Sequence, residues 1–119
     1  MNEIYFYGLP GCSTCQKALR RLEYHSVPVA KLRNIKEEPL SRAEIEELAK
    51  TLGSAENLFS RRSVKYRELG LRDKILSENE MLDLMAGEYT FLKRPILAVN
   101  DKVIAGFFEK EYDEFFRRR

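Results

Sequence analysis

The residues of this chain best suited to chemistry are its two cysteines, Cys12 and Cys15, which are spaced C-x-x-C. A β-rich run, Ile4–Tyr7, ends in the loop signal Gly8-Leu9-Pro10-Gly11, and a helical pattern follows from Ser13 to His25. We therefore predict that Cys12 lies at the start of a helix. Unpaired backbone N–H groups and the helix dipole stabilise a thiolate there.

The spacing of the pair predicts thiol–disulfide exchange. Cys12 is placed to attack and form a mixed disulfide, and Cys15, one helical turn later, is placed to resolve it. Lys17 and Arg20 add positive charge nearby. Two alternatives are an inert pair in the core and a metal site. Tetrahedral zinc needs four ligands, and two thiols and the single histidine, His25, are too few unless two chains share the metal. We expect neither a metal nor a bound cofactor.

The elements around the pair indicate an α/β protein. Ser41-x-x-Glu44 and Ser77-x-x-Glu80 are capping-box patterns that open two helices. The expected elements after the first helix are a strand at Val27–Leu32, helices at 41–52, 55–59 and 77–86, strands at 96–99 and 103–105, and a last helix after Gly106.

This order of elements is that of a thioredoxin-like (glutaredoxin-like) βαβ-ββα core with a helical insertion in the middle of the chain. The 119 residues suit a single domain over 1–119. We expect the core at about 1–36 and 92–119 and the insertion at about 40–88.

Composition excludes several classes of protein. Hydrophobic residues make up 44% and charged residues 34% of the chain, which is typical of a globular domain. The net charge of +2 is low for a nucleic-acid module, so we expect no direct nucleic-acid binding. No apolar run is long enough to span a bilayer, and Glu3 without a basic flank is not a secretory signal. We expect a cytoplasmic monomer.

Three stretches together resemble the arsenate reductase (ArsC)/Spx family of thioredoxin-fold proteins. They are Tyr7-x-x-Pro10-x-Cys12-Ser13-Thr14-Cys15-Gln16-Lys17-Ala18, then Phe59-Ser60-Arg61-Arg62-Ser63 with Tyr66-Arg67-Glu68-Leu69-Gly70-Leu71, and finally Leu92-Lys93-Arg94-Pro95-Ile96. The resemblance covers nearly the whole chain, with its motifs in the family's order.

The resemblance implies roles for individual residues. Cys12 matches the catalytic or redox cysteine, Arg94 an arginine that binds an oxyanion or steadies the thiolate, and Pro95 the cis-proline that faces the cysteine. A guanidinium also suits an oxyanion by its planar fork of donors. The alternatives are a surface salt bridge for Arg94 and a strand-edge proline for Pro95. Ser13 and Thr14, beside the cysteine, complete the expected substrate-binding set together with Arg62.

The chain departs from glutaredoxin-coupled arsenate reductases in three places. Those enzymes have no second cysteine at the position of Cys15, whereas Spx-type members do. The position of one of their arginines falls on Ser60, while Arg62 fits the Ser-x-Arg-Ser pattern of Spx-like members. An arginine expected in the last hairpin has no counterpart in Lys102–Ala105.

Two functions therefore stay open, and the enzyme is slightly favoured. The first is a reductase, in which glutathione or a thioredoxin/glutaredoxin-type protein supplies the electrons. The second is an Spx-like redox-switched regulator, whose surface around Gly53 would contact the C-terminal domain of the RNA polymerase α-subunit. A third, less specific interpretation is a family member with degenerate activity and no defined partner.

Overall fold

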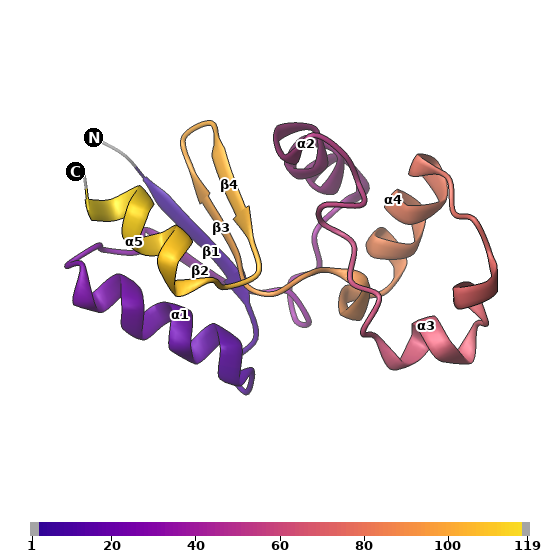
Figure 1. Cartoon of the computed structure of the whole chain (residues 1–119), viewed down its shortest axis with the longest axis horizontal. Helices are drawn as coiled ribbons and strands as arrows, with labels where there is room; N and C mark the ends of the chain where they lie inside the picture. Colours follow the sequence, from indigo (N-terminus) through magenta and orange to yellow (C-terminus); the bar gives the residue numbers. More distant parts are fainter. Residues whose placement is uncertain (1–2, 118–119) are drawn as a thin grey trace. The chain divides into compact units, whose positions relative to one another are not determined.

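The computed structural model describes residues 3–117 and shows an α/β protein (Figure 1). Short 3₁₀ helices, labelled η, accompany the α-helices and strands. The elements in chain order are β1 (Ile4–Gly8), α1 (Ser13–Tyr24), β2 (Lys31–Asn34), α2 (Arg42–Leu52), α3 (Val64–Glu68), η1 (Leu71–Asp73), α4 (Glu78–Gly87), η2 (Tyr89–Phe91), β3 (Ile96–Val99), β4 (Lys102–Ala105) and α5 (Glu109–Arg117). None of the described helices is long and apolar enough to cross a membrane.

The chain forms two compact units. The first contains the residues up to Ile35 and those from Arg94 onward, and the second is Lys36–Lys93. The strands β1 to β4, with α1 and α5, belong to the first unit. The second unit is helical and enters the sequence between β2 and β3.

The sheet of the first unit has the strand order β2-β1-β3-β4. β1 runs parallel to β2, and the crossover that a parallel pair requires is supplied by α1. β3 pairs antiparallel with both β1 and β4, so that Tyr7 lies opposite Ile96. The first half is thus βαβ and the second ββα. The predicted fold class is confirmed.

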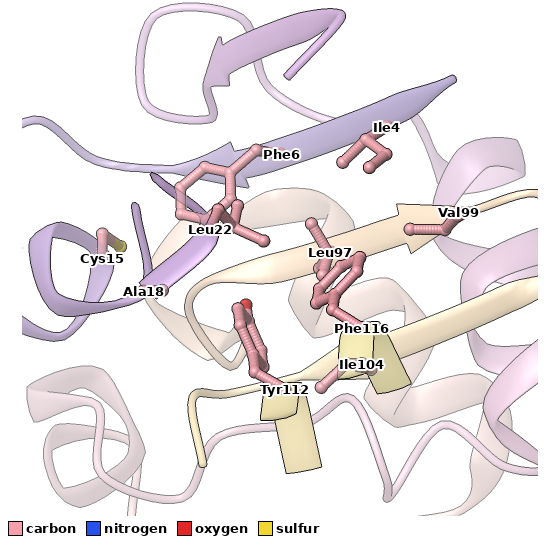
Figure 2. Packing of buried hydrophobic residues seen from close by; sticks show 10 residues of the cluster. All are labelled: Ile4, Phe6, Cys15, Ala18, Leu22, Leu97, Val99, Ile104, Tyr112 and Phe116. Atoms are coloured by element: carbon pink, nitrogen blue, oxygen red, sulfur yellow. The ribbon is translucent and has the colours of Figure 1, made fainter. Parts of the chain in front are cut away.

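The core of the first unit lies between the sheet and the helices α1 and α5 (Figure 2). Alternate residues of β1 point to this face, since Ile4 and Phe6 are buried whereas Tyr5 and Tyr7 are only partly so. The cluster consists of Ile4, Phe6, Cys15, Ala18, Leu22, Leu97, Val99, Ile104, Tyr112 and Phe116. One of the two cysteines is therefore part of the hydrophobic core.

The second unit is organised by its helix ends and its aromatic core. Both predicted capping boxes are present, Ser41 with Glu44 at α2 and Ser77 with Glu80 at α4. α2 ends at Gly53, whose φ of 99° lies in the left-handed region that favours glycine. Beyond it, the rings of Phe59 and Phe91 stack with their centroids 5.4 Å apart.

Two predictions about elements were wrong in detail, and two short helices were missed. β2 begins at Lys31, because Pro28 has no N–H to give to a ladder and the residues before Ala30 pack against the core without regular pairing. Residues 55–59 form a turn, closed by a bond from the Phe59 N–H to the Ala55 carbonyl at 2.9 Å, and not a helix. The short helices α3 and η1 were not predicted, because so few residues show no clear periodicity.

Candidate redox site

Cys12 is the N-cap residue of α1. Its backbone is extended, with φ −82° and ψ 117°, and its Sγ accepts a hydrogen bond from the backbone N–H of Cys15 at 3.3 Å. The loop before it is held by the Cys12 N–H, which bonds the Leu9 carbonyl at 3.3 Å, and by Gln16 Nε2, which donates to the Pro10 carbonyl at 2.9 Å. The half-buried sulfur therefore lies at the positive end of the helix dipole, where negative charge is favoured.

Cys15 occupies a different environment. It is 1% exposed and lies in the core cluster. Burial raises the pKa of its thiol to about 12, and hydrogen bonding to Cys12 acts in the same direction, while the charge of Arg94 opposes the rise. Cys15 is consequently a neutral thiol behind an accessible partner. The pair is asymmetric in the way that an attacking and a resolving thiol require.

Gly8, the last residue of β1, allows the close packing of this thiol against the strand. A Cβ atom on Gly8 would lie 2.9 Å from Cys15 Sγ and 3.1 Å from Cε1 of Phe6. A glycine at the strand end is therefore needed for the close approach of α1. Sequence reasoning treated Gly8 only as a loop signal, and a glycine ending a strand just before a reactive cysteine could have suggested this role.

Arg94 and Pro95 lie at the same end of the sheet as the cysteine loop. Since Tyr7 is opposite Ile96, the antiparallel register brings the residues before Ile96 level with those after Tyr7. The Arg94–Pro95 peptide bond is cis, the geometry that the family resemblance implies. Nη1 of Arg94 is buried and has no hydrogen-bond partner among the described residues. A guanidinium with a free buried donor, whose charge also acts on the Cys15 thiol, can hold an anion.

The remaining expected site residues lie in different places. Ser13 and Thr14 are exposed in the first turn of α1, directly after Cys12. Arg62 is exposed in the second unit, where its backbone N–H donates to Ser60 Oγ at 3.3 Å. The cysteines, Ser13, Thr14, Arg94 and Pro95 all belong to the first unit. No group of three or more His, Cys, Asp or Glu residues within 3–117 could hold a metal ion.

An ion cluster joins α1 to α5, and sequence reasoning missed it. Arg21 donates to both carboxylate oxygens of Asp113, at 2.7 and 2.8 Å, and His25 Nε2 lies 2.7 Å from Oδ1 of the same residue. Hydrogen bonds from Arg21 and then His25 hold the pKa of Asp113 well below its usual range. His25 was expected to end the helix, and it is the C-cap. Its contact with Asp113 had no local signal, because 88 positions separate the two residues.

Fold and site together define a class: a thioredoxin-fold domain whose C-x-x-C pair begins the first helix of the βαβ half. The model of the ArsC family matches residues 7–115. The chain therefore belongs to the ArsC family.

Among curated relatives, the uncharacterized protein YusI of Bacillus subtilis is 37% identical, over 92% of this chain and 94% of its own. The global transcriptional regulator Spx of Listeria innocua is 32% identical, over 98% of this chain and 88% of its own.

Solved structures show the same fold. A putative ArsC family related protein from Bacteroides fragilis is 27% identical, with a TM-score of 0.84 over 94% of this chain and 96% of that chain. A possible arsenate reductase from Streptococcus mutans is 30% identical, with a TM-score of 0.75 over 90% of this chain and 92% of that one. The chain is thus similar both to a protein described as a regulator and to one described as a possible reductase.

Proposed function

We propose that this chain is a thiol–disulfide redox protein in which Cys12 is the nucleophile and Cys15 the resolving thiol. The observation that carries the proposal is the hydrogen bond from the Cys15 N–H to Cys12 Sγ at 3.3 Å, made at the start of α1 while the Cys15 side chain is buried behind it. The accessible sulfur is the one that the helix N-terminus favours as an anion.

The chemistry takes two steps. Cys12 thiolate attacks an oxidised substrate, for example a disulfide, so that a new bond forms to Cys12 Sγ and the leaving group departs with the bonding electrons. Cys15 then loses its proton and attacks Cys12 Sγ, which releases the bound half as a thiolate and leaves a Cys12–Cys15 disulfide. Because burial raises the pKa of Cys15 to about 12, little of it is a thiolate at neutral pH, and the step requires that its proton pass to a base, for which the departing thiolate is available. Glutathione or a thioredoxin/glutaredoxin-type protein returns the two electrons.

Arg94 is the residue proposed to hold an anionic part of the substrate, since its buried Nη1 has no partner in residues 3–117. Ser13 and Thr14 in the first turn of α1, and Pro95, complete the proposed substrate-binding set in the first unit. Arg62 lies in the second unit, and its part in substrate binding stays a prediction from the family resemblance. An oxyanion such as arsenate is the substrate class that this set would select.

Peptide mapping of the reduced protein tests the proposal. The protein is exposed to arsenate, or to diamide as a general oxidant, and mass spectrometry reports whether Cys12 and Cys15 become linked. A link formed with arsenate and lost in Cys12→Ser supports a reductase. A link formed with diamide alone shows that the cysteines are redox-active and that arsenate is not their substrate. If neither reagent links the cysteines, the pair is not redox-active and the proposal fails.

A second candidate function is redox-switched regulation, favoured by the 32% identity to Spx over 98% of this chain. The proposed partner is the C-terminal domain of the RNA polymerase α-subunit, and the proposed contact surface surrounds Gly53 at the end of α2. Calorimetric titration of that domain into Gly53→Arg tests the contact. Gly70→Arg is the matched control, because Gly70 also has a positive φ, 66°, and a Cβ atom there meets nothing within 4 Å. Absence of binding by the unsubstituted protein in both redox states contradicts this function.

A further inference from the structure

A pocket of about 220 Å³ lies between α1 and the beginning of α5 in the first unit. The two helices pack against each other and cover the same face of the sheet (Figure 1). The pocket is lined by Lys17, Arg20, Arg21, Phe107 and Glu109. Three of its five lining residues are basic, although the chain as a whole carries a net charge of only +2.

Two of the three basic side chains are available to a ligand. Arg21 is already engaged, because it donates to both carboxylate oxygens of Asp113 and lies 3.7 Å from Glu109. Lys17 and Arg20, by contrast, are exposed, and neither side chain forms an ion pair or hydrogen bond within the part of the chain that the structure describes. The pocket therefore presents uncompensated positive charge.

Each wall of the pocket is connected through the chain to an element of the redox site. On one wall, Lys17 is in the second turn of α1, about 6 Å along the helix axis from its first residue. On the other wall, Phe107 follows Gly106, whose N–H donates to the Pro95 carbonyl at 2.8 Å. Phe107 and Cys12 both pack against the core cluster that contains Cys15. A small molecule bonded to Cys12 would thus have the pocket within reach.

We propose that this pocket binds the carboxylate end of a low-molecular-weight thiol, or of its disulfide, while the sulfur end exchanges with Cys12. The inference rests on the proposed redox function and names the class of its small-molecule partner. Lys17 and Arg20 pair with the carboxylates. The Phe107 ring, fixed edge-on to Tyr112 with centroids 4.8 Å apart, supplies an apolar wall for the carbon chain.

The exchange between Cys12 and the small disulfide needs no further oxidant or reductant. Cys12 thiolate attacks one sulfur of the small disulfide, a new S–S bond forms to Cys12 Sγ, and the original S–S bond breaks. The other half leaves as a thiolate that carries the bonding electrons. In the reverse direction, the small thiolate attacks the outer sulfur of the mixed disulfide on Cys12, which forms the small disulfide again and releases Cys12 as the thiolate, so the same pocket serves oxidation and reduction.

The test uses Cys15→Ser, in which the mixed disulfide cannot be resolved and accumulates. The rate of its formation is measured by acid quench and mass spectrometry with two probes, glutathione disulfide, which carries carboxylates, and bis(2-hydroxyethyl) disulfide, which is uncharged. Lys17→Gln and Arg20→Gln are added together. The control adds Lys31→Gln and Lys102→Gln, two exposed lysines of the same unit outside the pocket, with the same change in net charge.

We expect the pocket variant to react about tenfold more slowly with glutathione disulfide, since an exposed charge pair contributes up to about fivefold. Its rate with the uncharged probe and both rates of the control should stay within about twofold of the parent. Added salt should slow the glutathione reaction of the parent and of the control, and should have little effect on that of the pocket variant. An equal loss with both probes, or no loss with glutathione disulfide, overturns the pocket assignment while Cys12 still reacts. A parent that reacts with neither probe overturns the redox function itself.

Discussion

The buried hydroxyl of Tyr112 is expected to lower the stability of the protein. The side chain is 0% exposed in the core between the sheet and α5, and its oxygen has no hydrogen-bond partner among the described residues. Burial raises the pKa of Tyr112 far above its ordinary value, so the group stays a neutral O–H. We expect Tyr112→Phe to stabilise the protein.

The magnitude follows from what the substitution removes. An unpaired buried hydroxyl costs about 1–3 kcal/mol of desolvation, and phenylalanine keeps the same ring. The edge-on contacts of that ring with Phe107, at 4.8 Å, and with Phe116, at 6.1 Å, are retained. The free energy of unfolding should therefore rise by about 1 kcal/mol or more. For a chain of this length the melting temperature should rise by roughly 3–6 °C.

Urea unfolding followed by circular dichroism measures the change, and a thermal melt checks it. Tyr66→Phe is the control, because that part-buried hydroxyl accepts a hydrogen bond from Arg61 Nη1 at 3.1 Å. Its loss should lower the free energy of unfolding by about 0.5–1.5 kcal/mol. A Tyr112→Phe protein less stable than the parent by 1 kcal/mol or more would refute the reasoning, since it would show that the hydroxyl is paired in the folded chain.

Three further predictions concern the first unit. Gly8→Ala places a Cβ atom 2.9 Å from Cys15 Sγ, so urea unfolding should show that the free energy of unfolding falls by about 1–3 kcal/mol. Alkylation of the remaining free thiols at successive times should show that the Cys12–Cys15 disulfide also forms more slowly. In Cys12→Ser, alkylation of Cys15 by iodoacetamide should rise about tenfold per pH unit and reach no plateau below pH 11, because burial raises the pKa of this thiol; a plateau near pH 8 would contradict it. Asp113→Asn should be less stable than the parent at neutral pH. The pKa of Asp113 is lowered chiefly by Arg21, so its contribution is complete above the ordinary value of about 3.9 and disappears on acidification; unfolding curves at several pH values should show the gap closing below about pH 4.

The parts of the fold that could be predicted are those with a local signal. The helix that Cys12 caps begins where a loop of Gly and Pro residues meets an apolar periodicity, and both capping boxes mark their helices by two residues three positions apart. The last hairpin was equally clear. Residues 64–73 were missed because their helices are too short for a period to accumulate.

The site was predictable in its chemistry and not in its environment. C-x-x-C at a helix start indicates redox thiols, but no local pattern says that Cys15 belongs to the core while Cys12 is only half-buried. That asymmetry arises from contacts with β1, including the close approach at Gly8. The pairing of Arg21 with Asp113 likewise joins residues 92 positions apart, which only the tertiary fold brings together.

The place where the second unit enters the chain has a consequence for engineering. The first unit consists of two chain segments. One ends at Ile35, just after β2, and the other begins at Arg94, just before β3. Ile35 is tied back by its N–H to the Gly8 carbonyl at 3.1 Å, and β1 lies between β2 and β3 in the sheet. Two strand spacings are about 10 Å, which a linker of roughly four residues can bridge. The whole of Lys36–Lys93 could thus be exchanged for that linker, or for the corresponding segment of a relative, with β1 to β4 and both cysteines retained. In such chimeras the thiol chemistry would come from one parent and the surface of the helical segment from the other, so each property could be assigned to its own segment.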